Sequence, residues 1–554
     1  MSVALFDVSW ESVPGPARWK PVCGGKRFIE VPARAQMSFA VRCIDDFVPE
    51  DASVRLLEVI LDALDFTAFE AQYPGGGRPA YEPRFMCGIL YHAHCSGVRS
   101  AREISRRLES DLNFMWLAHE VRVDHEALSD FRRRFRKELK GIFKQTVQLA
   151  KRMGLVGMEL GAIDGTKIAA DAARRAQTEE SLGKALEKLD ERIEQMLAEA
   201  EATDRAEDAQ FGKASRGDTV PKELQTAEAR RAKLQEALAA LQASGREHIS
   251  LGDPEAPLQK TQDGKRPGYN GQAVVDDKVG YIVAQDVVTD QTDTEQFKPM
   301  AEQAAENLGQ MPDALIGDNG YHSEGTLQYL AQPEINGYIN QKPDRKDGRF
   351  DHDDFSYDEA SDTYTCPAGE TLEYHGTKLL RDTEYRRYRA QTTCKHCPQR
   401  ASCISENARY RELVVAPHEK LLAAMRRKMQ TPEGERARAL RKQTVERTFG
   451  TMKAVLGLRQ FLLRGLEGAQ IEFTLCATAV NLRKLIGWLR TEGSLALLRE
   501  AATELAAPAG FSLFLRRLLG LATRPLAATC HLPARKVRHT RGRIESRHAI
   551  RCHA

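Results

Sequence analysis

Three acidic residues have the types and sequence contexts that two-metal-ion chemistry on a phosphodiester requires. Asp164 follows the apolar run in MELGAID, Asp318 ends DALIGD, and Glu446 lies in a basic helical segment predicted over 435–455. Two divalent ions about 3.5–4 Å apart activate an attacking oxygen and stabilise a leaving oxygen, and they need carboxylates from different elements. We therefore expect Asp164, Asp318 and Glu446 to be catalytic and to hold two Mg²⁺ (or Mn²⁺) ions, because magnesium prefers oxygen ligands.

The third acid shares a predicted helix face with two lysines. Lys442, Glu446 and Lys453 follow one another at steps of four and seven residues, which places them on one side of a helix. A carboxylate between two cations fits a metal ion next to a phosphate. The alternative is a surface helix with ion pairs, but an apolar side is predicted to fix the orientation of the helix; its residues are Val445, Phe449, Met452 and Val455.

Four cysteines gather in one part of the chain. Cys394 and Cys397 are two residues apart, Cys403 follows, and Cys366 lies upstream in TCPAGE. Four thiolates satisfy a tetrahedral zinc ion, and such a closed site is structural. The alternative is four reduced free thiols, and His396 is expected to be exposed rather than a ligand.

The elements that must position the acids alternate between strands and helices. The pattern predicts a strand that ends at Asp164, a hairpin over 271–288, a helix over 292–308, a strand that ends at Asp318, a helix over 323–332 and a strand over 337–342. This order predicts an α/β fold, in which helices flank a mixed sheet and two strands each deliver an aspartate at one edge.

Five segments surround or interrupt this sheet. Residues 1–47 are irregular, and 48–154 form a helical domain of the DNA-binding type with a basic run from Arg132 to Lys137. The heptad-like spacing of leucines predicts a helical hairpin within 174–247. This hairpin either has only a structural role or is an arm that contacts a second protomer or DNA. The cysteine-containing insertion spans 343–420. We expect the catalytic domain to span 155–489. Residues 490–554 begin with a helical segment and end in a basic tail, for which we expect disorder.

Composition restricts the class of protein only weakly. The 554 residues carry 81 Lys and Arg against 78 Asp and Glu, so the formal net charge of +3 does not by itself indicate a nucleic-acid partner. No export signal or membrane span is apparent. The dispersed cysteines favour a reducing compartment, and we expect a cytoplasmic protein without a membrane partner.

Several motifs resemble the bacterial insertion-sequence transposases of the DDE type, in the insertion sequence 4 superfamily and of the insertion sequence 1182 kind. The resemblance runs from about Val48 to Leu489 and rests on AIDGTKIAADA, KRPGYNGQAVVD, IGDNGYHSEG, KQTVERTFGTMKAVLGLRQFLLRG and the segment GGRPAYEPRFMCGILYHAHCSGVRSAREISRRLESDLNFMWL. It implies a ribonuclease H-like core, with Asp164, Asp318 and Glu446 as its acids. It also implies cut-and-paste recombination at terminal inverted repeats. The expected protein is cytoplasmic and nucleoid-associated, and it acts on double-stranded DNA as a homodimer.

DNA contacts are expected around these acids, at Lys453, Lys442, Arg441, Arg447, Lys167 and Tyr321. The resemblance implies that Lys453 contacts the phosphate near the cleaved end. Tyr321 either stacks on a displaced base or packs inside its turn. The chain departs from the family where a tyrosine and an arginine often precede the glutamate, because Ala439 and Lys442 stand there. A lysine keeps the charge without the bidentate fork. Two other functions remain: a metal-dependent nuclease without joining, and an inactive DNA-binding relic.

Overall fold

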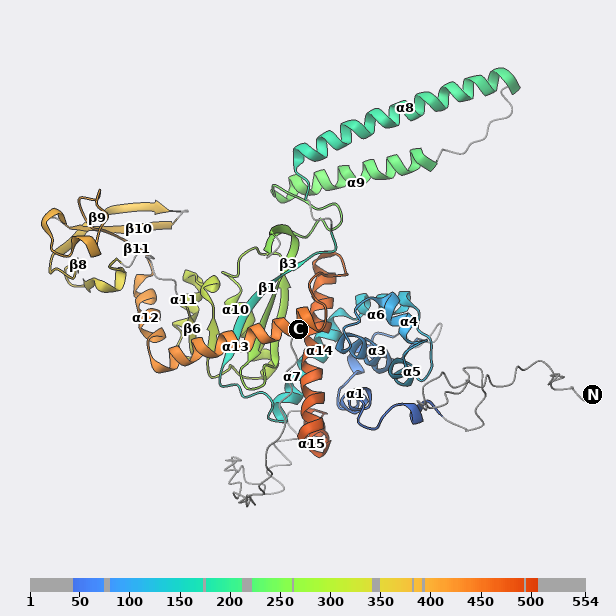
Figure 1. Ribbon diagram of the computed structural model, residues 1–554, viewed down its shortest axis with the longest axis horizontal. Coiled ribbons are helices and arrows are strands. Elements are labelled where there is room, and N and C mark those ends of the chain that lie inside the picture. The colour runs from blue at the N-terminus through green and yellow to red at the C-terminus, as the bar shows by residue number, and fades with distance from the viewer. Residues whose placement is uncertain are drawn as a thin grey trace, which may run out of the picture. The chain divides into compact units, whose positions relative to one another are not determined.

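The computed structural model describes residues 43–73, 80–172, 176–211, 222–261, 264–340, 349–380, 383–390, 394–492 and 495–506. Contact clustering divides the chain into residues 1–503 and 504–554. All elements described below except the end of the last helix belong to the first unit, and Figure 1 shows their arrangement. The basic tail and most of the irregular N-terminal segment lie outside the described residues.

The N-terminal part is helical. It contains η2 (Ile44–Phe47), α1 (Ser53–Asp62), α2 (Thr67–Glu70), α3 (Pro83–Cys95), α4 (Ala101–Arg107), α5 (Leu112–Leu117), α6 (His125–Arg134) and α7 (Arg136–Arg152). Pro83 starts α3 at a position where its missing N–H costs nothing, and nearly every later residue of α3 is buried. Asp124 caps α6 by accepting a hydrogen bond from the Ala127 N–H at 2.7 Å.

The basic run at the α6–α7 junction is largely committed to contacts within the protein. Arg132 is only 3% exposed and donates to the Arg99 carbonyl, Arg133 pairs with Asp130, and Arg136 pairs with Glu467. The Arg132 side chain therefore faces the core and is withdrawn from solvent.

The central sheet is mixed. Its described strands are β1 (Gly161–Ala169), β2 (Leu258–Thr261), β3 (Gly264–Asp276), β4 (Ile282–Val288), β5 (Leu315–Gly317) and β6 (Gly337–Ile339). Their order is β2–β3–β1–β5–β6, and β4 also pairs with β3. The β3 strand is antiparallel to β1 and β4, whereas β1, β5 and β6 are parallel to one another.

The first strand is longer than the sequence pattern predicts. Asp164 lies inside β1 and not at its end, because pairing with β3 continues to Ala169 opposite Gly268. The neighbour on the other side is short: the register with β5 runs only through Gly161 opposite Leu315 and Ala162 opposite Ile316. Asp164 is consequently the point where β1 passes beyond its parallel neighbour, even though the strand itself goes on.

Helices pack on this sheet and join it to the N-terminal helices. They are α10 (Phe297–Leu308), η3 (Asn319–Tyr321), α11 (Glu324–Leu330), α12 (Glu419–Met429), α13 (Pro432–Ala454) and α14 (Gly465–Glu492); α15 (Leu495–Ala506) follows α14 along the chain. The α14 helix contacts α3, α7 and β4, and one hydrophobic cluster extends from Leu57 to Ala501. A pair between Arg99 and the buried Glu472 adds a polar link between the N-terminal helices and α14. The N-terminal helices and the sheet therefore share one core.

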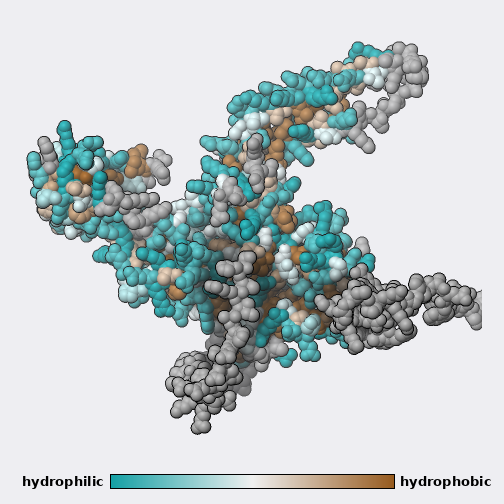
Figure 2. Space-filling view, viewed as in Figure 1, coloured by the Kyte–Doolittle hydropathy of each residue, from teal (hydrophilic) through white to brown (hydrophobic). Residues whose placement is uncertain are grey.

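Two long helices leave the sheet between β1 and β2. The α8 helix (Glu179–Phe211) and the α9 helix (Lys222–Ser244) lie side by side, and hydrophobic residues line the space between them, while hydrophilic residues cover the outward face of α8 (Figures 1 and 2). Leu182, Leu234 and Leu241 form a small core of their own. These helices occupy the segment in which heptad spacing predicts a hairpin.

A second sheet lies between β6 and α12. It contains β7 (Ser356–Asp358), β8 (Thr363–Thr365), β9 (Thr371–Leu380), β10 (Thr383–Ala390) and β11 (Glu412–Val415), in the order β11–β10–β9–β8–β7. Short helical turns η4 (His352–Asp354), η5 (Cys394–His396) and η6 (Arg400–Ser402) accompany it. It has a separate hydrophobic cluster that includes Cys403. No helix in the described parts of the chain combines the length and apolar character needed to cross a bilayer.

Candidate active site

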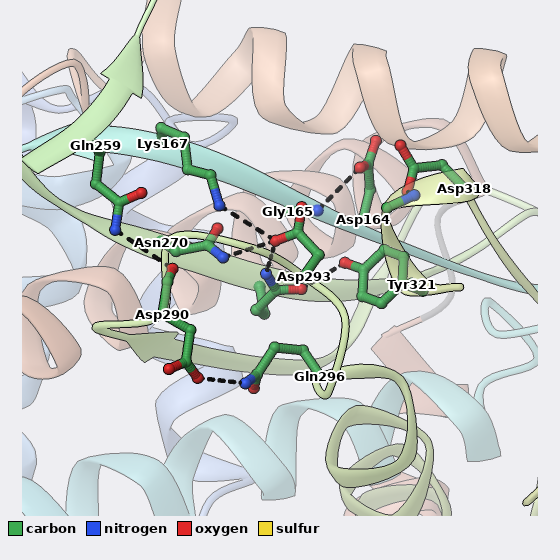
Figure 3. A network of polar contacts seen from close by, with 12 residues as sticks. Asp164, Gly165, Lys167, Gln259, Asn270, Asp290, Asp293, Gln296, Asp318 and Tyr321 are labelled. Atoms are coloured by element: carbon green, nitrogen blue, oxygen red, sulfur yellow. Dashed lines mark hydrogen bonds and ion pairs between the residues drawn. The ribbon is translucent and has the colours of Figure 1, made fainter. Parts of the chain in front are cut away.

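Asp164 and Asp318 lie beside each other because of the register between β1 and β5. The pairing of Ala162 with Ile316, continued by two residues, places Asp164 opposite Asp318. Figure 3 shows the two side chains next to each other. Asp318 caps η3 by accepting a hydrogen bond from the Gly320 N–H at 2.7 Å, and Asp164 accepts one from the Gly165 N–H at 2.9 Å. Both carboxylates are thus oriented by the backbone.

A third aspartate, Asp293, lies beside this pair. It belongs to the loop between β4 and α10, and its Oδ1 accepts hydrogen bonds from Asn270 Nδ2 and Gln272 Nε2, both at 2.6 Å, and from Lys167 Nζ at 3.3 Å (Figure 3). Its negative charge raises the pKa of Asp164, as that of Asp318 does. Three carboxylates therefore act on one another here.

Burial is the largest influence on Asp164. It raises the pKa of Asp164 to about 6, with smaller contributions in the same direction from Asp318 and Asp293. The guanidinium of Arg441 opposes this shift, since its Nη1 lies 3.2 Å from Asp164 Oδ2. The site therefore holds negative charge that a bound cation would relieve.

The α13 helix supplies Arg441 and carries the third predicted acid. Val445, Phe449 and Met452 are buried as predicted, and the helix contacts β1, β3 and β5 through this side. Val455 is 48% exposed, so its assignment to the buried side was wrong; α13 ends at Ala454, and the helical spacing no longer applies beyond it.

Glu446 is exposed on α13, as are Lys442 and Arg447. In the described part of the chain, Glu446 does not join the aspartates in a group of three arranged to hold a metal ion. Lys453 is half-buried; burial lowers its pKa, and attraction to Asp164 opposes that shift. Of the residues predicted on this helix, Arg441 and Lys453 thus act electrostatically on Asp164, and the role of Glu446 stays a prediction.

The two predicted DNA contacts outside α13 have partners within the protein. Burial lowers the pKa of Lys167, and its ion pair with Asp293 opposes the shift. Tyr321 is fully buried, and its hydroxyl donates to Gln272 Oε1. Stacking of Tyr321 on a base is therefore contradicted: the ring has no exposed face, and the alternative of a packed turn aromatic describes it.

The chemistry of these side chains fits hard divalent cations. Carboxylate oxygens are the ligands that Mg²⁺ and Mn²⁺ prefer, and Asp164 and Asp318 present them from adjacent strands. Across the described residues, no three or more His, Cys, Asp or Glu side chains already have the arrangement of a metal site. Arg441 pairs with Oδ2 of Asp164, so its guanidinium would compete with a metal ion for that oxygen.

The four predicted zinc ligands lie around one cavity of the second sheet. Cys366, Cys394, Cys397 and Cys403 all line it. Burial raises the pKa of the Cys403 thiol, and the three other thiols nearby contribute in the same direction. The Sγ of Cys394 accepts from the Arg411 N–H at 3.4 Å, and the Sγ of Cys366 accepts from the Glu370 N–H at 3.3 Å. His396 is exposed, as expected.

Sequence reasoning missed Asp293. The segment from Thr292 fits the start of a helix, but α10 begins only at Phe297, and Asp293 remains in the preceding loop. Its partners come from β1 and β3, more than 20 residues away along the chain. The signal available in the sequence was a cluster of acids, Asp290, Asp293 and Glu295, directly after a predicted strand.

Two family models match parts of the chain. Residues 365–486 match a family described as transposase DDE domain, and residues 42–134 match one described as transposase domain (DUF772). The first match contains Glu446, Lys453 and the four cysteines, whereas Asp164 and Asp318 lie between the two matched segments. No curated protein matches the chain.

Among solved structures, the chain is similar to one described as "Cryo-EM structure of piggyBac transposase synaptic complex with hairpin DNA (SNHP)". The identity is 10%, the alignment covers 84% of each chain, and the TM-score is 0.30. A TM-score this low does not establish a common fold. Similarity to transposase domains therefore rests on the two family matches, over residues 365–486 and 42–134.

Proposed function

We propose that this protein is a transposase that cleaves DNA and transfers strands at the terminal inverted repeats of an insertion sequence, using divalent metal ions. The observation that carries the proposal is the register that sets Asp164 beside Asp318, with Arg441 and Lys453 close to the pair. Anionic ligands from adjacent strands, surrounded by cationic side chains, suit a metal ion next to a phosphate. The matches to transposase domains support the same class of reaction.

In this proposal Asp164 and Asp318 hold two Mg²⁺ or Mn²⁺ ions, and Glu446 is their third acid. The metal ions, when bound, activate the attacking oxygen and stabilise the leaving oxygen. Lys453 binds the phosphate near the cleaved end. Arg441 leaves Asp164 and turns to the DNA backbone, where its planar guanidinium can contact a phosphate through two N–H groups.

The strand order supports a ribonuclease H-like core. Three parallel strands, β1, β5 and β6, continue into the antiparallel β3 and β4, and the proposed acids lie where the short parallel strands end. We propose that double-stranded DNA crosses this edge and contacts the exposed side chains of Lys442 and Arg447. Because two transposon ends must be joined, we propose a homodimer on DNA.

A structural zinc ion is part of the proposal. Cys366, Cys394, Cys397 and Cys403 line one cavity, and backbone N–H groups donate to the sulfur atoms of Cys366 and Cys394. Four thiolates would hold the turns η5 and η6 against β8 and β9. The zinc ion would stabilise the small second sheet, whose hydrophobic cluster is limited.

The decisive experiment measures Mg²⁺- or Mn²⁺-dependent cleavage and joining of DNA that carries the native element ends. Asp164→Asn, Asp318→Asn and Glu446→Gln should each abolish both reactions while binding of the ends persists. Cleavage by the wild type without joining would replace the proposal with a nuclease. Binding without cleavage would indicate an inactive relic, and full activity of the variants would refute the assigned acids.

A further inference from the structure

Asp293 is held so that its two carboxylate oxygens have different surroundings. All three donors to this side chain, Lys167, Asn270 and Gln272, bond to Oδ1. On the other side, Oδ2 lies 3.4 Å from the position that a Cβ atom would take at Gly320, and Asp318 Oδ1 lies 2.9 Å from the same position. The donors therefore fix Asp293, while Oδ2 faces Asp318.

Two glycines make room for this arrangement. A Cβ atom at Gly165 would lie 2.6 Å from both Asp293 Oδ1 and Gln272 Nε2, closer than side chains tolerate. Gly320 is less confined: a Cβ atom there would lie 2.9 Å from Asp318 Oδ1 and 3.4 Å from Asp293 Oδ2. Asp293 can approach the two strand aspartates only because both neighbouring positions lack a side chain.

The surroundings of Asp293 account for only one of its two carboxylate oxygens. The ammonium group of Lys167 pairs with Oδ1, and the two amides of Asn270 and Gln272 bond to the same atom. A cation bound between Asp293 and Asp318 would use the second oxygen, and carboxylate oxygens are the ligands that Mg²⁺ and Mn²⁺ prefer.

We propose that Asp293 is a further metal-binding carboxylate of this site, presenting Oδ2 to a divalent ion that Asp318 also holds. This inference rests on the proposed two-metal function and adds to it a ligand from the loop before α10. It also gives Lys167 a role, because its ammonium group holds Oδ1 and thereby keeps Oδ2 turned to the ion. Asp293 would occupy the side of the site opposite α13, which carries Arg441 and Glu446.

The test measures Mn²⁺ binding by isothermal titration calorimetry with the full chain and without DNA. Asp293→Asn keeps an oxygen for the Oδ1 donors and removes the charge, so its Mn²⁺ dissociation constant should rise about tenfold or more. Asp290→Asn is the matched control: it makes the same change in the same loop, but the Asp290 side chain is exposed, accepts from Gln296 at 2.7 Å and takes no part in the hydrogen bonds that hold Asp293. Its affinity should stay within about twofold of the wild type.

Two further variants separate this inference from the proposed function. If Asp164→Asn and Asp318→Asn lose Mn²⁺ binding while Asp293→Asn retains wild-type affinity, Asp293 only supports the loop and the inference is overturned. If the wild type binds no Mn²⁺, the two-metal function itself fails. Thermal unfolding of Asp293→Asn without metal should be no lower than that of the wild type; a large loss there, with unchanged Mn²⁺ affinity, would also mean a purely structural role.

Discussion

Arg441 Nη1 lies 3.2 Å from Asp164 Oδ2, so an ion pair links α13 to β1 at the site. Both side chains are about three-quarters buried, at 22% and 23% exposure. A cation that binds Oδ2 of Asp164 would compete with this guanidinium. Arg441, which the sequence predicts to contact DNA, would then also be a competitor of the metal ion.

Replacing Arg441 with glutamine should tighten metal binding. At pH 8, where Asp164 is ionised, Arg441→Gln removes both the competing partner and a positive charge, and we expect Mn²⁺ affinity to rise about fivefold, equivalent to about 1 kcal/mol. Arg441→Lys keeps the charge and should show a smaller gain. Calorimetric titration of the three proteins measures the effect; weaker binding by Arg441→Gln would mean that Arg441 helps to build the metal site.

Metal binding should depend on pH through Asp164. Burial raises the pKa of this carboxyl from 3.8 to about 6, so below pH 6 it is mostly protonated and must lose a proton before it binds a cation. Mn²⁺ affinity should then fall about tenfold for each pH unit below 6 and level off above it. Equilibrium titrations between pH 5 and 8 measure this, and a profile without change between pH 5 and 7 would contradict the assignment.

The same pKa shift has a consequence for stability. Because the folded protein binds the proton of Asp164 more tightly than the unfolded chain does, ionisation destabilises the metal-free fold as the pH rises through the range from 3.8 to about 6. Asp164→Asn should therefore unfold at a higher temperature than the wild type at pH 8 and not at pH 4. Equal melting temperatures at pH 8 would show that Arg441 compensates the charge fully.

Gly165→Ala should disturb the site directly. Its Cβ would lie 2.6 Å from Asp293 Oδ1 and Gln272 Nε2, and overpacking of this kind costs about 1–3 kcal/mol. We expect a lower melting temperature and weaker Mn²⁺ binding. Gly183→Ala in α8 is the control: no atom lies within 4 Å of the added Cβ, and alanine should stabilise the helix by up to about 1 kcal/mol. A melting temperature of Gly165→Ala equal to the wild type would mean that β1 and the Asp293 loop adjust freely.

The cysteine cavity should contain zinc. Purified protein should carry about one zinc ion per chain, and Cys397→Ser should lower both the zinc content and the melting temperature of the second sheet. Cys43→Ser is the control, because Cys43 is exposed and far from the cavity in sequence. Elemental analysis measures the zinc content, and thermal unfolding measures the melting temperature. A wild-type protein that is stable without zinc would mean that the four cysteines are free thiols.

Much of the local structure follows from the sequence, because it depends on contacts between neighbours in the chain. The spacing of Val445, Phe449 and Met452 predicts the buried side of α13, and the two apolar runs that become β3 and β4 predict a hairpin. The position of Asp318 after a short apolar run predicts a residue at the end of a strand, and it directly follows β5. The buried side of α13 repeats at the helical period, whereas the strands are short apolar runs that are buried along most of their length.

Tertiary structure decides which residues meet and which are withdrawn from solvent. Asp164 lies beside Asp318 through the register of β1 and β5, and Asp293 reaches them only because β1 and β3 bring Lys167, Asn270 and Gln272 together around one oxygen. Burial of Tyr321 likewise depends on packing that no local pattern encodes. A sequence pattern specifies which residue types could bind a metal ion or DNA, but contacts between strands distant in the chain determine which of them converge, because their partners are chosen by register and packing.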